Sequence, residues 1–163
     1  MPSKTDIIVN GLDLTVYGLE EYNNLPKGTP VGILFAIHGR LQQKAIMEPL
    51  AGVVCPLNDT RSDPGQRHLL VVTFDQVNHG SRLVDKNANN GWEAHNPSHA
   101  VDMWSMIHTG ANTVSELIDV LEHYLFGGQR PVQVWGCMGF SMGGHVAFLA
   151  GAQGRKKRAS SRM

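Results

Sequence analysis

One short run of residues constrains the fold of this chain more than any other. The run Gly139-Phe140-Ser141-Met142-Gly143 directly follows the apolar stretch 132–138. A serine held on a sharp turn between a strand and a helix takes a strained backbone conformation, and side chains two positions away from it would collide with the neighbouring chain. Glycine at positions 139 and 143 avoids that collision. The spacing therefore predicts a strand, a tight turn with an outward-pointing Ser141, and a helix.

Such a turn suits a nucleophile. The serine hydroxyl lies at the N-terminus of the helix, where free backbone N–H groups and the helix dipole favour a developing oxyanion. The alternative is a glycine-rich turn with a capping serine, because 18 of the 163 residues are glycine and the motif alone has little specificity. The strand–turn–helix context and the additional Gly144 favour the nucleophile.

The composition indicates one globular domain with a real core. The chain has 163 residues, of which 42% are apolar and 17% charged, unlike a disordered chain. The formal net charge is zero, but residues 155–163 hold five of the 14 basic residues and no acid. The remaining chain is therefore mildly acidic. We expect no nucleic-acid partner for such a body.

The two cysteines, Cys55 and Cys137, do not form a metal-binding pattern with the histidines, so we expect no metal and no cofactor. Cys137 is expected to be a small buried hydrophobe inside a strand. The N-terminus lacks the apolar run of a signal peptide, and no segment approaches 18 apolar residues. We therefore expect no membrane partner and a cytoplasmic location. The sequon Asn58-Asp59-Thr60 is then expected to carry no sugar.

Apolar runs predict strands at five places, 7–9, 12–16, 31–37, 69–74 and 132–138. The first two are joined by Asn10-Gly11, a strong signal for a hairpin. The other three are continuous apolar runs, typical of strands buried on both faces of a parallel sheet.

Helical spacing of apolar residues predicts helices at 43–54, at 113–126 and after Ser141. Pro49 must lie in the first turn of the first helix or kink it. Thr113 and Glu116 form a capping box for the second helix, which ends at Gly127-Gly128.

The segments between these elements are expected to be loops. Residues 58–66 are polar and contain Pro and Gly, and residues 76–111 are predicted to form a long surface loop with one short helix near 100–106. A loop of that length in a compact domain is usually functional or mobile. The alternation of strands and helices predicts an α/β fold with a parallel sheet behind an antiparallel start.

Three landmarks, in this order, resemble the α/β-hydrolase superfamily up to about residue 152. His38-Gly39-Arg40 follows the third strand, where that family has its oxyanion loop. The run from Asp75 to Arg82 is similar to the family's Asp-x-x-Gly-His-Gly-x-Ser, with Asn78 in place of the first glycine. The serine turn follows the fifth strand. The resemblance implies an α/β-hydrolase-type, mostly parallel sheet with flanking helices.

The resemblance also implies roles for individual residues. Ser141 is the nucleophile, which forms an acyl-enzyme with a carboxylic ester, a thioester or a peptide, so a small acyl substrate is the expected partner. The N–H of Met142 is one oxyanion donor, and that of Arg40 or Leu41 is the second. Losing one such donor typically raises the barrier by about 3–4 kcal/mol. The residues expected to shape the site are His38, Gly39, Gly139 and Gly143.

The catalytic acid and base are missing from the expected places. The family's chain order is serine, acid, histidine, but His145 is the only histidine after Ser141, and no Asp or Glu follows. One helical turn beyond the serine, the ring of His145 is expected to point away from the position of a general base. Asp75 and His79 are expected to be structural.

We therefore expect only the N-terminal half of the fold. Residues 1–153 are interpreted as a partial α/β-hydrolase domain and residues 154–163 as a basic, disordered tail of unrelated sequence. The alternative for the tail is a nuclear-localisation or anion-binding patch.

Two functions from different classes remain. The chain is either a serine hydrolase, with this copy lacking part of its triad, or a non-catalytic fragment or interaction module. In either case nothing apolar remains to pair with the strand before Ser141, so we expect an unpaired sheet edge and self-association through it.

Overall fold

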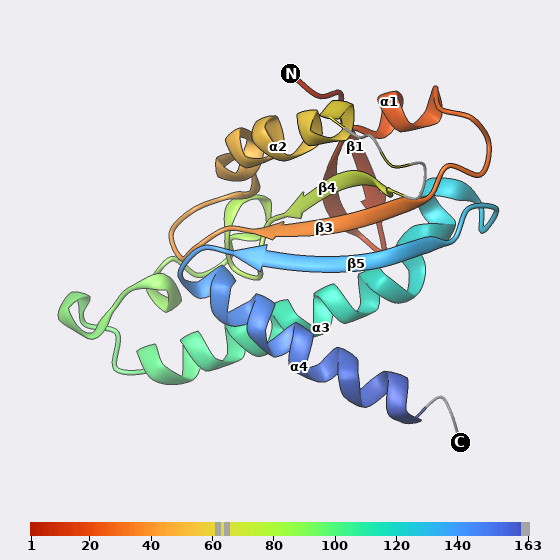
Figure 1. Cartoon of the computed structure of the whole chain (residues 1–163). Coiled ribbons are helices and arrows are strands. Elements are labelled where there is room, and N and C mark those ends of the chain that lie inside the picture. Colours follow the sequence, from red (N-terminus) through yellow and green to blue (C-terminus); the bar gives the residue numbers. More distant parts are fainter. Residues whose placement is uncertain (61–62, 64–65, 161–163) are drawn as a thin grey trace.

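Five strands form one mixed sheet, in the order β1-β2-β4-β3-β5, with helices on both faces (Figure 1). The computed structural model describes residues 1–60, 63 and 66–160, and it describes side chains as far as Gln153. The strands are β1 (Lys4–Val9), β2 (Leu12–Tyr17), β3 (Val31–Ile37), β4 (His68–Phe74) and β5 (Val132–Gly139).

The helices alternate with these strands. They are α1 (Leu19–Asn23), α2 (Glu48–Val54), α3 (His99–Phe126) and α4 (Met142–Ser160), with 3₁₀ turns η1 (Lys44–Met47), η2 (Cys55–Thr60), η3 (Gly80–Arg82), η4 (Asn87–Asn89) and η5 (Trp92–Ala94). In the part of the chain that the structure describes, none of the helices has the length and apolarity needed to cross a bilayer.

The predicted hairpin and the predicted parallel core are confirmed. Asn10 and Gly11 both have positive φ, at 54° and 77°, as a tight hairpin turn between antiparallel strands requires, and Val9 lies opposite Leu12. Strand β2 then pairs antiparallel with β4, whereas β3 pairs parallel with both β4 and β5. The fold class is therefore the mixed α/β sheet that the sequence predicts.

Two apolar layers cover the sheet. The larger core lies between the sheet and the pair α3–α4, where Leu121 and Val146 are fully buried. The smaller core lies under α2 on the opposite face and includes Ala36 and Ala51. Helices α3 and α4 pack so closely that a Cβ on Gly110 would lie 2.8 Å from a methyl of Val146. This packing holds α4, and with it the turn that precedes α4, against the sheet.

The predicted loop is confirmed only as far as residue 98, where it contains the turns η3, η4 and η5, and the predicted helix start at Thr113 is wrong. Helix α3 runs without a break from His99 to Phe126, so Thr113 lies in its middle. There its hydroxyl donates to the carbonyl of Thr109 at 2.9 Å and caps nothing. The N-terminal turns of α3 are helical because Met106 and Ala111 pack into the fold, a tertiary effect that overrides weak local preference. The predicted end is confirmed, since Gly127 takes φ 59°.

One further expectation is confirmed in part, and another needs correction. Residues 44–54 form the 3₁₀ turn η1 and then α2, with Pro49 in the first turn of α2 as predicted. Strand β5 is not buried on both faces, because it lies at the edge of the sheet and its Val134 and Met138 are exposed. Cys137 is accordingly only half-buried.

The domain boundary stays a prediction. Helix α4 extends to Ser160, past the predicted boundary at residue 153. The side chains beyond Gln153 lie outside the described residues, so the basic tail has no structural account here. The predicted loop 58–66 lies partly outside them as well, although η2 occupies its start as far as Thr60.

Candidate active site

The turn between β5 and α4 carries Ser141. This residue lies two positions after the end of β5 and immediately before α4, and its φ is 53°, in the left-handed region that non-glycine residues rarely occupy. The turn is closed by two backbone hydrogen bonds, from Gly143 to the carbonyl of Phe140 at 2.9 Å and from Gly144 to that of Ser141 at 2.8 Å. The strained conformation is therefore held by the fold around it.

Both predicted glycines stand where a side chain has no room. A Cβ on Gly139 would collide with the backbone of Gly143, and a Cβ on Gly143 would collide with the carbonyls of Ile37 and His38 at the end of β3. The close approach of α4 to β3 is thus the physical reason for the glycine spacing.

The serine and the amide beside it are free to act on a ligand. The Ser141 side chain is exposed, and within the described part of the chain its hydroxyl has no hydrogen-bond partner. The N–H of Met142, at the start of α4, has no acceptor among the described residues either. A free N–H at a helix N-terminus favours an anion.

The turn after β3 provides further free amides. The N–H of Gly39 is already used, since it donates to Oε1 of Gln42 at 2.8 Å. The next two N–H groups, those of Arg40 and Leu41, have no acceptor in the described residues, and Leu41 takes φ 64°. These are the two predicted alternatives for the second oxyanion donor. The structure leaves both alternatives open.

Two residues that the sequence analysis did not single out, Gln42 and Asn89, hold this turn. Gln42 occupies the Gly39 N–H, and the guanidinium of Arg40 donates to the carbonyl of Asn89 at 2.7 Å. The second contact joins residues 49 positions apart, so no local pattern could have revealed it.

His38 is fully buried and braces the same turn. Its Nδ1 donates to the carbonyl of Gly39 at 2.8 Å, and its Nε2 accepts from the N–H of Gln76 at 3.0 Å. Burial lowers the pKa of His38, and the nearby His79 adds to this effect, whereas the hydrogen bond to Gly39 and the carboxylate of Asp75 oppose it. With both ring nitrogens engaged, neutral His38 has no free atom with which to serve Ser141.

Asp75 joins the loops that follow β3 and β4. Its carboxylate accepts from the N–H of Lys44 at 2.7 Å and from the N–H and hydroxyl of Ser81 at 2.8 and 2.9 Å. Burial alone would raise the pKa of Asp75, but these hydrogen bonds and His38 outweigh it and hold the pKa below its usual value. The carboxylate of Asp75 therefore stabilises the two loops.

Asn78 takes the conformation that a glycine would adopt easily. Its φ is 59°, and its Oδ1 accepts from the N–H groups of Val84 at 3.0 Å and Asp85 at 2.8 Å. Asparagine tolerates this region because its side chain bonds nearby backbone. The asparagine at this position is therefore compatible with the same turn.

Neither remaining histidine near the turn contacts the serine hydroxyl. His145 is exposed, and its Nδ1 donates to the carbonyl of Ser141 at 3.1 Å, not to the side chain. His79 is buried, with Nδ1 on the carbonyl of Val77 at 2.9 Å, and its Nε2 has no partner among the described residues. The described residues therefore place no general base on Ser141.

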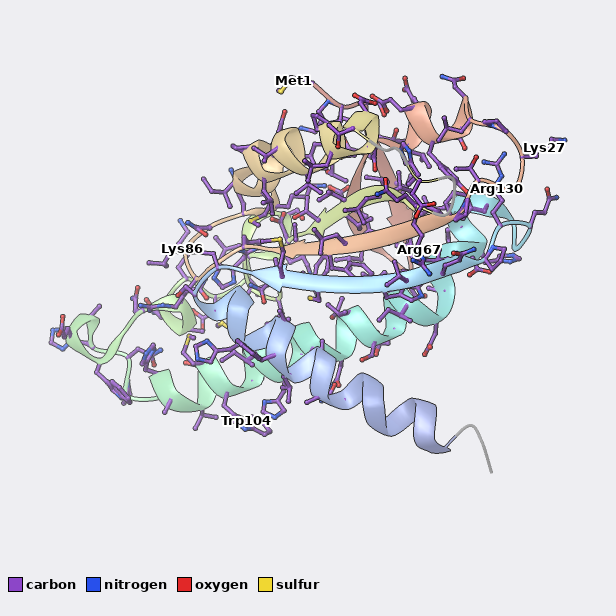
Figure 2. All side chains as sticks on the ribbon, in the orientation of Figure 1. Met1, Lys27, Arg67, Lys86, Trp104 and Arg130 are labelled. Carbon is purple, nitrogen blue, oxygen red and sulfur yellow. The ribbon has the colours of Figure 1, made fainter. Side chains whose placement is uncertain are left out.

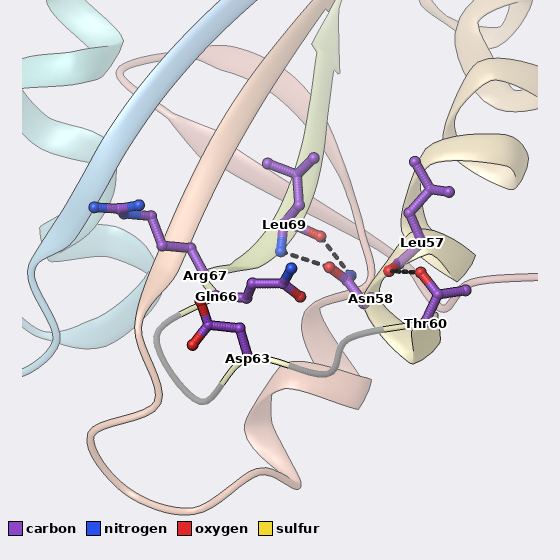
Figure 3. A pocket seen from close by; sticks show the side chains of 7 residues that line it. All are labelled: Leu57, Asn58, Thr60, Asp63, Gln66, Arg67 and Leu69. Atoms are coloured by element: carbon purple, nitrogen blue, oxygen red, sulfur yellow. Dashed lines mark hydrogen bonds between the residues drawn. The ribbon is translucent and has the colours of Figure 1, made fainter.

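One pocket lies away from this turn. It has a volume of about 450 Å³ and is lined by residues of η2, of the segment before β4 and of the start of β4, as Figure 3 shows. There the amide of Asn58 bonds both the N–H and the carbonyl of Leu69 at 2.8 and 2.9 Å. Arg67 lies at this amino end of the strands and Lys86 at the opposite, carboxyl end (Figure 2). Ligands of open parallel sheets bind at the carboxyl ends, where Ser141 lies.

The described residues also offer no clustered set of His, Cys, Asp or Glu that could hold a metal ion. Ser141 provides an exposed hydroxyl, and Met142 and Arg40 provide backbone N–H groups that have no acceptor among the described residues. No described residue with a basic side chain bonds that hydroxyl.

The fold is α/β-hydrolase-like. Among solved structures, TT1662 from Thermus thermophilus matches with a TM-score of 0.51 and 19% identity, over 94% of this chain and 52% of that one. This chain spans about half the length of the protein it matches. At this identity the likeness shows the fold alone. No family model matches the chain, and no curated protein matches it.

Proposed function

We propose that this chain carries the nucleophile and the oxyanion donors of a serine hydrolase that acts on a carboxylic ester, a thioester or a peptide bond. The observation that carries the proposal is the backbone of Ser141, which keeps φ 53° between β5 and α4. Such strain costs about 1–3 kcal/mol, persists only where the surrounding structure imposes it, and clusters at active sites. The backbone collisions that exclude a Cβ at Gly139 and Gly143 support a turn built for this one conformation.

The proposed chemistry is acyl transfer. The hydroxyl oxygen of Ser141 bonds to the acyl carbon, and the carbonyl oxygen becomes an oxyanion facing the N–H of Met142 and that of Arg40 or Leu41. Collapse of this intermediate breaks the bond to the alcohol, thiol or amine, which leaves with a proton, and water then releases the acid. The oxyanion donors act only as negative charge develops, so they lower the barrier rather than merely bind substrate.

The step that needs help is removal of the hydroxyl proton. An isolated serine is a weak nucleophile, and loss of a triad member costs on the order of 10⁴-fold in turnover. Because no described residue takes a hydrogen bond from Ser141, we expect a slow reaction in this chain. The oxyanion donors can then provide at most about 10³-fold over water.

The proposal is tested by fluorophosphonate labelling with peptide mapping. Ser98 is the matched internal control, because it also immediately precedes a helix, α3, but has φ −90° and no strand before it. We expect slow labelling of Ser141 in the folded chain, none at Ser98, and none after Ser141→Ala or in urea. Equal labelling of both serines, or equal labelling in urea, would refute the proposal.

The second candidate is a non-catalytic interaction module. Within the described residues the Ser141 hydroxyl has no partner and β5 is an edge strand, and both features favour this candidate. Failure of Ser141 to label in the folded chain would support this candidate over the hydrolase.

A further inference from the structure

Strand β5 forms one edge of the sheet. In the part of the chain that the structure describes, β5 pairs only with β3, so its other side presents unpaired backbone N–H and C=O groups. The opposite edge, β1, carries Lys4 and Asp6, and charged side chains discourage strand pairing. The register with β3 skips Gln133, so the regular part of β5 runs from Val134 to Gly139. That part contains no charge and no proline.

One face of β5 is also bare. Trp135 and Cys137 point into the core with α3 and α4, where Trp135 stacks on Phe35 at 5.9 Å. Val134 and Met138 point to the opposite face, the one that α2 covers farther along the sheet, and they are 43% and 38% exposed. An edge and an apolar face are therefore uncovered together.

The charge of this region favours a second copy over a charged partner. No residue between Arg130 and His145 is charged or a histidine, so two copies of the region do not repel each other and offer a charged partner nothing to pair with. An edge of this kind is an effective template for another strand of the same type.

We propose that two copies of this chain pair antiparallel through β5, about a two-fold axis perpendicular to the sheet. Such an axis keeps the α2 face of both copies on one side, and directly opposite residues of an antiparallel pair share a face. Gly136 then lies opposite Gly136 of the second copy, and Val134 opposite Met138 of the second copy. This register covers both exposed side chains of the bare face, and we name the assembly the β5 dimer.

The register centred one residue later covers less of the exposed apolar face. Centred on Cys137, it would place Met138 opposite Gly136 and leave Val134 opposite Phe140, outside the strand. The proposed register also places the large Trp135 opposite the small Cys137, and alternating sizes pack well. The inference concerns assembly only and does not depend on catalysis at Ser141.

The oligomeric state tests the β5 dimer. Light scattering behind size exclusion should give twice 17.8 kDa at micromolar concentration. Val134→Lys should give a monomer with an unchanged far-UV spectrum. The matched control is Ile8→Lys on the β1 edge, also exposed at 72%, which should remain a dimer. A monomeric parent chain, or a dimer that survives Val134→Lys, would overturn the proposal.

Disulfide trapping tests the register without relying on the lysine variants. Directly opposite residues of an antiparallel pair have Cα atoms about 4.5–5.5 Å apart, within the range of about 4.4–6.8 Å that a disulfide spans. A mixture of Val134→Cys and Met138→Cys chains should form a covalent heterodimer under mild oxidation. Either variant alone, and the parent chain, should not. A Cys137–Cys137 disulfide in the parent chain would contradict the register.

Discussion

Replacing Gly143 by alanine tests the claim that close backbone contact builds the serine turn. A Cβ on Gly143 would collide with the carbonyl oxygens of Ile37 and His38 and would lie 2.8 Å from the carbonyl carbon of Ile37. The obstacle is backbone, and the Ile37 carbonyl is also fixed because it accepts from the N–H of Phe140 at 3.1 Å. Neither side can yield without opening the turn.

The magnitude is the difference between two effects. Overpacking typically costs about 1–3 kcal/mol, and contact with rigid backbone belongs at the upper end. Alanine in place of glycine within a helix gains about 1 kcal/mol. We therefore expect Gly143→Ala to lower the free energy of unfolding by about 2 kcal/mol.

Two other glycines of α4 separate these effects. A Cβ on Gly151 meets nothing within 4 Å, so Gly151→Ala should stabilise by the helix preference alone, about 1 kcal/mol. A Cβ on Gly144 would lie 3.3 Å from the carbonyl of Gly139, a tight contact that small shifts relieve, so Gly144→Ala should fall between the other two. Urea unfolding at one protein concentration measures all three. If Gly143→Ala is as stable as Gly151→Ala, the close approach of α4 to β3 is wrong.

Three further predictions concern the buried groups and the serine. Hydrogen bonds hold the pKa of Asp75 below its usual value, so the stability that its carboxylate contributes is present above about pH 4 and lost as pH falls. Urea unfolding at pH 7 and pH 3 should therefore show a smaller pH dependence of stability for Asp75→Asn than for the parent chain. Leu121→Ala removes a fully buried side chain and should cost about 2–5 kcal/mol by the same measurement, and a smaller loss would show that the α3 core is loose. The chain should hydrolyse a short p-nitrophenyl ester barely above background, and Ser141→Ala should change that rate little; robust turnover lost in the variant would show that a base reaches the serine.

The sequence predicted the elements whose causes are local. Asn10-Gly11 forms the hairpin turn because both residues accept positive φ. The run 31–37 forms β3 with the predicted bounds, since a continuous apolar stretch fits a strand covered on both faces. Gly127 ends α3 for an equally local reason, the left-handed conformation that follows a helix.

The sequence failed where distant residues decide. The first turns of α3 contain His and Thr residues that weaken the periodic pattern, and packing of Met106 and Ala111 makes them helical. Likewise, the contact between Arg40 and Asn89 that holds the turn after β3 joins segments 49 positions apart. The composition of the segment before residue 112 indicated a loop. Composition alone does not show which distant residues pack against a segment in the fold.

Strand β5 and the glycines that follow it show one failure and one success of sequence-based prediction. The apolar run 132–138 predicted a buried strand, but burial depends on what packs around a strand, and among the described residues β5 pairs only with β3. The spacing of Gly139 and Gly143 looks like a local signal, yet the carbonyls that require Gly143 are those of Ile37 and His38, at the end of β3 and just after it, about a hundred positions earlier in the chain. A short motif can thus locate Ser141 reliably in this fold because it records a contact between distant segments. A run of apolar residues carries no information on such a contact. It therefore predicts that a strand forms, but not the strand's position in the sheet.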